Sequence, residues 1–197
     1  MASVLPESDK DPRLYQDPYL DWCEREALPI YDVFGVDLLT LETKPWPRVD
    51  ANGAFVHLKG RGDFISVFLI DIPPGASISP QQHLYEEVIF VMAGHGSTTI
   101  ETHDGRKHSF EWGPKSLFAL PLNCQYQHFN GSGRDAVRLA STNTLCVMLN
   151  LLHNEEFVFD NPFRFPEREG EEGYFTGGGD FYGGKRGRNI WETNFVP

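Results

Sequence analysis

The chain has 197 residues, enough for one well-buried core but too few for two full-sized enzymatic domains. Its residues are 40% hydrophobic and 23% charged, which is typical of a globular protein and excludes fibrous and low-complexity classes. The 17 Lys and Arg residues against 28 Asp and Glu give a net charge of −11, which repels nucleic-acid phosphates and anionic membrane surfaces. We therefore expect neither nucleic acid nor a membrane as a partner.

The cysteine pattern and the N-terminus indicate the cellular compartment. Cys23, Cys124 and Cys146 show no CxxC spacing, so neither a disulfide framework nor a thiolate zinc site is expected. The first residues lack the basic and apolar regions of a signal peptide, and no apolar run is long enough to span a bilayer. These features predict a cytoplasmic protein.

Residues 1–53 are expected to form an N-terminal helix and arm. Asp17 is a favourable N-cap residue and Pro18 suits the first helical position, so the sequence predicts one short helix over residues 17–27. A closely spaced apolar stretch predicts a strand near residues 37–41, and the prolines and glycine that follow it indicate an extended arm.

Residues 54–153 have the texture of a β-domain. Short runs of strand-forming residues alternate with turn sequences, and no helical pattern lies between them. Eight or so strands at such even spacing are typical of an antiparallel sandwich or barrel. The predicted strands are AFVHLK, FISVFLIDI, EVIFVMAG, GSTTIET, KHSFEW, SLFALP, AVRLASTN and CVMLNLL.

Residues 154–197 form a separate segment that is rich in glycine, aromatic residues and charge. Such a composition cannot build a core of its own, yet it holds too many aromatic residues for a simple linker. We expect a C-terminal tail or connector that wraps over its own barrel or over a neighbouring subunit.

The strongest chemical signal lies in the run Gly75–Gly94, GASISPQQHLYEEVIFVMAG. Gln81 and His83 are two residues apart and share one face of an extended segment, and Glu87 follows at the start of an apolar strand. A short polar cluster thus leads into an apolar strand and a glycine turn.

This run resembles the first motif of the cupin superfamily. Gly75, His83, Glu87 and Gly94 fall on the motif, and Gln81 stands where a first histidine is usual. The second cupin motif resembles residues 112–133, where Asn123 replaces the usual glycine and Tyr126 stands where the last metal-binding histidine is expected. His128 lies two residues after Tyr126, and residues two apart on a strand face the same way, so both side chains would point into the barrel. The positions that match the second motif are Gly113, Pro121 and Asn130.

The resemblance implies an all-β fold, the cupin double-stranded β-helix or jelly-roll barrel, with a short N-terminal helix and a long C-terminal arm. The whole chain is also similar to the N-terminal half of bicupin proteins. By the same resemblance, Gln81, His83, Glu87 and His128 would bind a divalent metal, with Fe(II) favoured over Mn, Ni, Cu or Zn. Glu87 and Tyr126 would be catalytic, and Gln81 and Tyr126 would contact the substrate.

The implied function is a metal-dependent enzyme that acts on a small organic substrate, for example an aromatic one, inside the barrel. The favoured class is a non-heme oxidoreductase of the dioxygenase type. One alternative is a metal-free or degenerate cupin that serves as a binding or oligomerisation module, or as one half of a bicupin-like assembly. Another is a non-redox lyase, isomerase or decarboxylase. We expect a homo-oligomer or pairing with a second cupin barrel.

Overall fold

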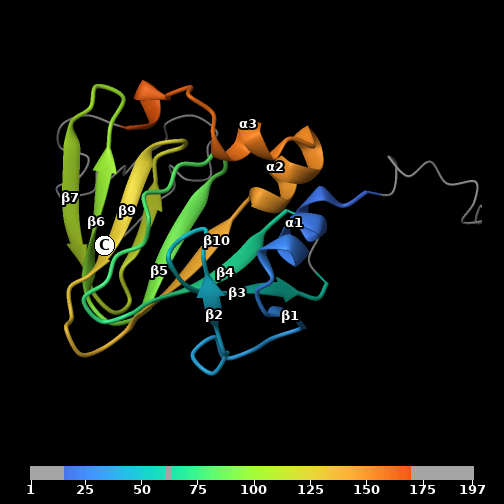
Figure 1. Cartoon of the computed structure of the whole chain (residues 1–197), viewed down its shortest axis with the longest axis horizontal. Coiled ribbons are helices and arrows are strands. Elements are labelled where there is room, and N and C mark those ends of the chain that lie inside the picture. The colour runs from blue at the N-terminus through green and yellow to red at the C-terminus, as the bar shows by residue number, and fades with distance from the viewer. Residues whose placement is uncertain (1–15, 61–63, 170–197) are drawn as a thin grey trace, which may run out of the picture.

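The computed structural model describes residues 16–60 and 64–169, and it is built mainly from β-strands (Figure 1). The helices are short and gather at one end of the molecule. In chain order the elements are α1 (Pro18–Glu26), β1 (Ile30–Val33), β2 (Lys44–Trp46), β3 (Ala51–Leu58), β4 (Ser66–Ile72), β5 (Glu87–Ala93), β6 (Gly96–Glu101), β7 (Lys107–Trp112), β8 (Leu117–Leu120), β9 (Gln125–Asn130), β10 (Val137–Asn143), α2 (Leu145–Leu152), α3 (Glu155–Phe159) and a 3-10 turn (Pro166–Arg168).

The strands form two sheets that enclose the core. The larger sheet has seven strands in the order β1-β3-β4-β10-β5-β8, with β2 paired to β3, and the smaller sheet has the order β7-β6-β9. The chain leaves the larger sheet after β5, builds most of the smaller one, and returns through β8 and β10. The predicted all-β class is therefore confirmed. Among the described residues, no helix is long and apolar enough to cross a membrane.

Alternation along the strands decides which side chains fill the space between the sheets. On β5, Glu87, Ile89 and Val91 are buried, whereas Val88 and Phe90 are 39% and 40% exposed on the opposite face. This is the period of two that a strand with one buried face requires. The same alternation turns Tyr126 and His128 of β9 inward.

Helix α1 agrees with its prediction and closes one side of the core. The Asp17 carboxylate accepts a hydrogen bond from the backbone N–H of Leu20, and Pro18 begins the helix. The helix ends at Glu26, and its C-cap residue Ala27 adopts a left-handed backbone conformation with φ of 56°. Its inner face buries Tyr19, Trp22 and Cys23.

The strand predicted near residues 37–41 is wrong. This segment is a turn, in which the Asp37 carboxylate accepts from the N–H of Leu39 and the Asp37 carbonyl accepts from the N–H of Thr40. Such local bonds compete with strand pairing. The strand lies earlier instead, at β1, which pairs in parallel with β3. The predicted arm thus contributes β1 and β2 to the larger sheet, and β3 crosses the predicted boundary between residues 53 and 54.

The last predicted strand of the barrel is also wrong, because residues 145–152 form helix α2. Leu145, Cys146 and Leu149 are buried at helical spacing. The preceding strand ends at Asn143, whose side-chain oxygen accepts from the N–H of Leu145 and so begins the turn into the helix.

The first part of the predicted tail, residues 154–169, returns over the end of its own barrel. Val158 is fully buried, and the ring of Phe159 lies 5.7 Å from that of Trp22, centroid to centroid. Residues 170–197, which include the glycine-rich part of the predicted tail, lie outside the described residues.

Candidate functional site

The polar side chains predicted to carry the chemistry meet inside the barrel, close to the end covered by residues 154–169. His83 precedes β5, Glu87 is the first residue of β5, and Tyr126 and His128 belong to β9. Their exposed fractions are 5%, 3%, 6% and 0%, so the cluster is closed to solvent. A polar group buried to this degree destabilises the fold unless it has a partner.

Three donor atoms of this cluster form a nearly equilateral triangle. His83 Nε2 lies 2.9 Å from Glu87 Oε2 and 3.1 Å from the Tyr126 hydroxyl. The Tyr126 hydroxyl in turn donates to Glu87 Oε2 over 3.0 Å. Each of the three atoms therefore lies within hydrogen-bonding distance of the other two.

The orientation of His83 is fixed by its other ring nitrogen. Nδ1 lies 3.2 Å from the backbone carbonyl of Tyr85, which can only accept, so Nδ1 carries a hydrogen. The imidazole also stacks on the Tyr85 ring at 3.6 Å between centroids. Nε2 then faces a carboxylate oxygen, and a bare lone pair would repel it. A hydrogen on one of the two facing atoms, or a cation bound by both, would remove this repulsion.

Both carboxylate oxygens of Glu87 make hydrogen bonds. Ser141 of β10 donates to Oε1 and accepts from the Asn143 amide over 3.0 Å. Burial by itself raises the pKa of Glu87, but the facing His83 and the hydrogen bonds from His83 and Ser141 outweigh it, and the pKa is lowered. Glu87 is thus an ionised carboxylate in a closed interior.

Tyr126 is the proton donor of the cluster. Burial, together with the nearby Glu87 carboxylate, holds the pKa of the Tyr126 phenol well above its usual range. The phenol therefore keeps its hydrogen and donates it to Glu87, which suits a group that supplies a proton or a hydrogen bond and not a general base.

His128 is the next inward-facing residue of β9 after Tyr126, and its ring lies 5.1 Å from the Tyr126 ring, centroid to centroid. Trp112 Nε1 donates to Thr98 Oγ1 over 2.8 Å, and Thr98 Oγ1 lies 2.7 Å from His128 Nδ1, which fixes the ring. His128 Nε2 is buried without a hydrogen-bond partner in the described part of the chain. Leaving such an atom unpaired costs about 1–3 kcal/mol, so a ligand at this position would stabilise the site.

Burial lowers the pKa of His128 to about 4, from an ordinary value of 6.5. The nearby Glu87 raises this pKa and His83 lowers it further, but burial is the largest cause. Between these pH values the unfolded chain binds the extra proton, so stability falls as the pH drops from 6.5 towards 4. We expect up to roughly 3 kcal/mol to be lost in chelator-treated protein. Urea unfolding at several pH values in this range measures the free energy of unfolding against pH. The slope of this plot should be shallower for His128→Gln than for the wild type. An unchanged slope would contradict the role of His128 in the pH dependence.

Gln81 is next to the cluster but its amide is engaged elsewhere. Gln81 Nε2 donates to the Ser79 hydroxyl over 2.8 Å and to the Ser79 and Arg48 carbonyls over 3.0 and 3.3 Å. Its backbone pairs with that of Tyr126. Within residues 16–60 and 64–169, no three His, Cys, Asp or Glu side chains are grouped to hold a metal ion, and the third donor beside His83 and Glu87 is Tyr126.

Sequence reasoning missed Ser141, Asn143 and Thr98, which support the cluster. The available signal was a set of polar residues at inward positions of otherwise apolar strands. Asn143 is the cross-strand partner of Glu87, and Thr98 is that of His128. Their roles depend on strand register, which one sequence does not provide.

The segment 158–163 covers the loop that carries His83 and the turn that precedes β9. The Val158 carbonyl accepts from the N–H of Leu84 over 2.7 Å, and the Asn161 carbonyl accepts from the Gln82 side chain over 2.7 Å. The Asn123 side chain also donates to the Asn161 carbonyl, over 2.9 Å. Asn123 has a left-handed backbone with φ of 57°, consistent with the glycine expected here by the cupin motif.

Among solved structures, the chain shows a distant likeness to cupin domains, with low sequence identities and TM-scores below 0.5. No protein-family model and no curated protein matches it. The cupin domain of Cnp3 from Schizosaccharomyces pombe is 17% identical, with a TM-score of 0.46, and the match covers 56% of this chain and 72% of that one.

Two larger proteins show similar likeness. Oxalate decarboxylase from Lactobacillus farciminis, solved as a formate complex, is 13% identical, with a TM-score of 0.46 and coverage of 54% of this chain and 32% of that one. Vicilin from Solanum lycopersicum (tomato) is 15% identical, with a TM-score of 0.44 and coverage of 48% and 28%. The match spans about a third or less of these two chains, and at such identities the likeness concerns the fold alone.

Proposed function

We propose that the chain is a metal-dependent cupin enzyme whose barrel holds one divalent ion through His83, Glu87 and Tyr126, with His128 beside it. The observation that carries the proposal is the triangle of donor atoms 2.9–3.1 Å apart, in which His83 Nε2 faces a carboxylate while Nδ1 is committed to a carbonyl. A histidine that binds a metal characteristically donates its other N–H to such a carbonyl.

The donor geometry supports this reading. Two ligands that bind a metal at about 2.1 Å and at right angles lie about 3 Å apart, which matches the three separations in the cluster. Two imidazoles, one carboxylate and one phenol are nitrogen and oxygen ligands that suit Fe(II), with Mn, Ni, Cu or Zn as alternatives. The unpartnered His128 Nε2 supplies the second imidazole.

The residues of the chain define what the enzyme can do. A bound Fe(II) would supply oxygen-activating chemistry of the oxygenase class. Glu87 stays ionised, Ser141 and Asn143 hold its orientation, and Tyr126 presents a proton at its hydroxyl. The closed interior excludes water and favours a small, largely apolar organic substrate.

Elemental analysis of the native full chain tests the proposal. We expect close to one divalent ion per chain, lost in His83→Ala and retained in His95→Ala, whose side chain is exposed. Protein that stays metal-free after supplementation would contradict the proposal. If the metal is present, oxygen consumption with phenols and keto acids as substrates separates an oxygenase from the lyase, isomerase or decarboxylase alternative.

We also propose that the barrel pairs with a second barrel, in a homo-oligomer or a bicupin-like assembly, because the outer face of the larger sheet is apolar. Val88 is 39% exposed, Phe90 40% and Leu117 67%, and Phe90 lies directly opposite Leu117 across β5 and β8. Adjacent exposed apolar side chains of this size are typical of interfaces.

A single charge in this patch is expected to break the pairing. Phe90→Asp should convert an oligomer into a monomer in light scattering, because a carboxylate would be buried without a partner. Leu151→Asp, at a side chain that is 71% exposed on α2, is the matched control and should leave the oligomer intact. A wild-type monomer at high concentration would contradict the pairing.

A further inference from the structure

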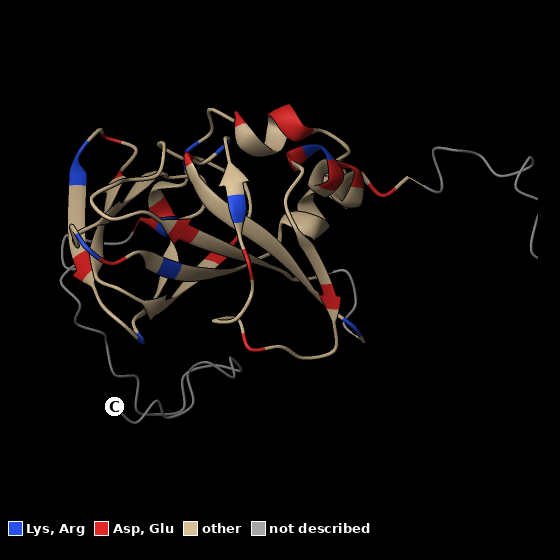
Figure 2. Cartoon of the chain, turned by 60° about the horizontal axis from the view of Figure 1, so that its bottom comes forward, with Lys and Arg blue, Asp and Glu red and all other residues tan. Residues whose placement is uncertain are grey.

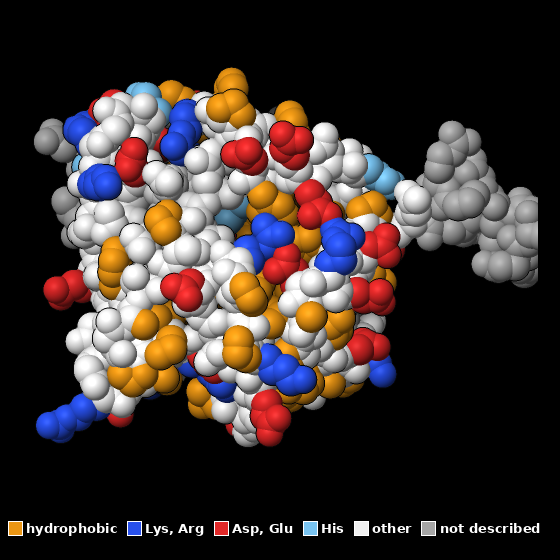
Figure 3. All heavy atoms as spheres, in the orientation of Figure 1, with side chains coloured by type: hydrophobic (Ala, Val, Ile, Leu, Met, Phe, Trp, Pro, Cys, Tyr) orange, Lys and Arg blue, Asp and Glu red, His pale blue; other side chains and the backbone are white. Residues whose placement is uncertain are grey.

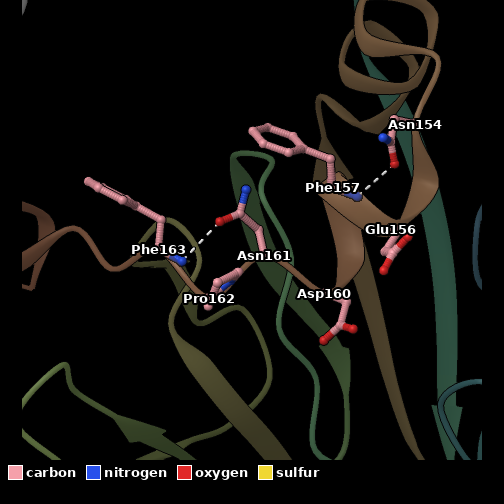
Figure 4. Close-up of a pocket in the computed structure, with 7 residues that line it drawn as sticks. All are labelled: Asn154, Glu156, Phe157, Asp160, Asn161, Pro162 and Phe163. Atoms are coloured by element: carbon pink, nitrogen blue, oxygen red, sulfur yellow. Dashed lines mark hydrogen bonds between the residues drawn. The ribbon is translucent and has the colours of Figure 1, made fainter.

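A cavity of about 590 Å³ lies outside the barrel, against α3 and the residues that follow it (Figure 4). Its size is within the usual range for ligand sites. The side chains that define its chemistry are Glu156, Phe157, Asp160, Asn161 and Phe163. None of them belongs to the cluster of His83 and Glu87, so this cavity is a separate site.

The first feature of the cavity is an unbalanced negative charge. Glu156 and Asp160 are four residues apart, and no ion pair involves either of them within the described part of the chain, whereas the adjacent Glu155 pairs with Arg25. Asp160 also lies at the C-terminal end of α3, where its backbone N–H bonds to the Glu156 carbonyl over 2.8 Å. Like charges at this spacing, and a carboxylate at a helix C-terminus, both destabilise a helix. A bound cation would remove both penalties.

The surrounding surface supports this charge pattern. The ribbon in Figure 2 is red at acidic positions of the helices, which include Asp21 of α1 and Glu155 and Glu156 of α3. In Figure 3 acidic and hydrophobic side chains lie next to one another in the region where Figure 1 places α3. A ligand for this surface has to combine positive charge with apolar contact area.

The second feature is a pair of exposed aromatic rings with an amide between them. Phe157 is 48% exposed and Phe163 60%. Asn161 is only 8% exposed, and its side-chain oxygen is fixed by the N–H of Phe163 over 2.9 Å. Its amide nitrogen makes no hydrogen bond within residues 16–60 and 64–169, and Figure 4 shows it turned towards the side of the two rings. This amide donor belongs to a residue that is itself nearly buried, and it suits a ligand that offers a carbonyl.

Carboxylates, phenyl rings and an amide donor together match a basic peptide. A guanidinium or ammonium group binds carboxylates, its methylene stem packs on aromatic rings, and a peptide carbonyl accepts from an amide. Arginine is the best fit, because its planar group is weakly hydrated and reaches two carboxylate oxygens at once.

We propose that this cavity binds the basic segment Lys185–Arg188 of the chain itself, KRGR. Lys185, Arg186 and Arg188 are the only basic residues after Glu169, which gives the segment the charge that the cavity lacks. The 15 residues 170–184 lie between the last described residue and Lys185. They can span up to about 50 Å, more than the width of a small domain of about 30 Å, so the segment can reach the cavity.

Carbodiimide cross-linking of the full-length chain, followed by peptide mass spectrometry, tests the proposal. This reagent joins a lysine amine to a carboxylate that it contacts. We expect Lys185 to link to Glu156 and Asp160 in preference to other carboxylates. Arg186→Ala with Arg188→Ala should lower the Lys185 links about fivefold, and Asp160→Asn should lower the Lys185–Glu156 link by a similar factor.

Glu155→Gln is the matched control, because Glu155 already pairs with Arg25, and it should leave the Lys185–Glu156 link unchanged. Cross-linking a mixture of isotope-labelled and unlabelled chains distinguishes docking within one chain from docking between two copies, and either result supports the proposal. Lys185 links spread evenly over the carboxylates of the protein, or a Lys185–Glu156 link that persists in Asp160→Asn, would overturn it.

Discussion

Replacing Trp22 by alanine is expected to lower the free energy of unfolding by about 3–5 kcal/mol, a large part of the stability of a domain this size. Trp22 is 1% exposed, and its side chain packs helix α1 against the larger sheet. Its indole lies 5.3 Å from the ring of Phe55 and 5.9 Å from that of Phe68, centroid to centroid. Removing it would open a cavity among aromatic rings that cannot collapse to fill it.

Urea unfolding followed by circular dichroism measures this effect. Leu20→Ala on the same helix is the control and should cost less than about 1 kcal/mol, because Leu20 is 42% exposed. Trp22→Phe adds a second comparison. Trp22 Nε1 is buried without a hydrogen-bond partner among the described residues, so phenylalanine removes an unpaired donor while it keeps most of the packing. We expect Trp22→Phe to cost well under half as much as Trp22→Ala, and equal costs would contradict this account.

The fold could be predicted from the sequence where local capping residues and the hydrophobic pattern indicate the same kind of element. Asp17 and Pro18 mark the start of α1 by themselves, and the alternation on β5 marks a strand with one buried face. The prediction fails for Cys146–Leu152, where nearly every residue is apolar and neither period stands out. Tertiary contacts decide the structure of that segment. Strand β10 already has β4 and β5 as its two neighbours, so the following residues cannot pair with it, and α2 packs against α1 instead.

The site was predictable in part for a similar reason. His83 and Glu87 are four residues apart, and Tyr126 and His128 two apart, so local geometry brings each pair to one side. The direction of the Gln81 amide depends on Arg48, 33 residues earlier, and the support of Glu87 depends on Ser141, 54 residues later. Contacts over such separations follow from the pairing of strands, which no spacing rule in a single sequence supplies.

Replacing Glu87 by alanine is expected to have two effects that can be measured separately. In chelator-treated protein it should cost about 3–5 kcal/mol, because removing one member of a buried charged network leaves the others unpaired. Ser141, His83 and Tyr126 all bond to this carboxylate, so three groups would lose their partner at once. His83→Ala should cost a similar amount, whereas the double variant should cost less than the sum of the two, by about 1–3 kcal/mol.

The second effect is the response to added metal. A ligand at 1,000 times its dissociation constant stabilises a folded protein by about 4 kcal/mol, so Fe(II) or its Mn, Ni, Cu or Zn substitutes should raise the stability of the wild type by roughly that amount. Glu87→Ala and His83→Ala should gain little, and Tyr126→Phe should fall between, because it keeps both residues but loses one corner of the triangle. If metal stabilises all four proteins equally, or none of them, then a hydrogen bond and not a metal joins His83 to Glu87. The cluster would then be a metal-free network, and the barrel a binding or pairing module.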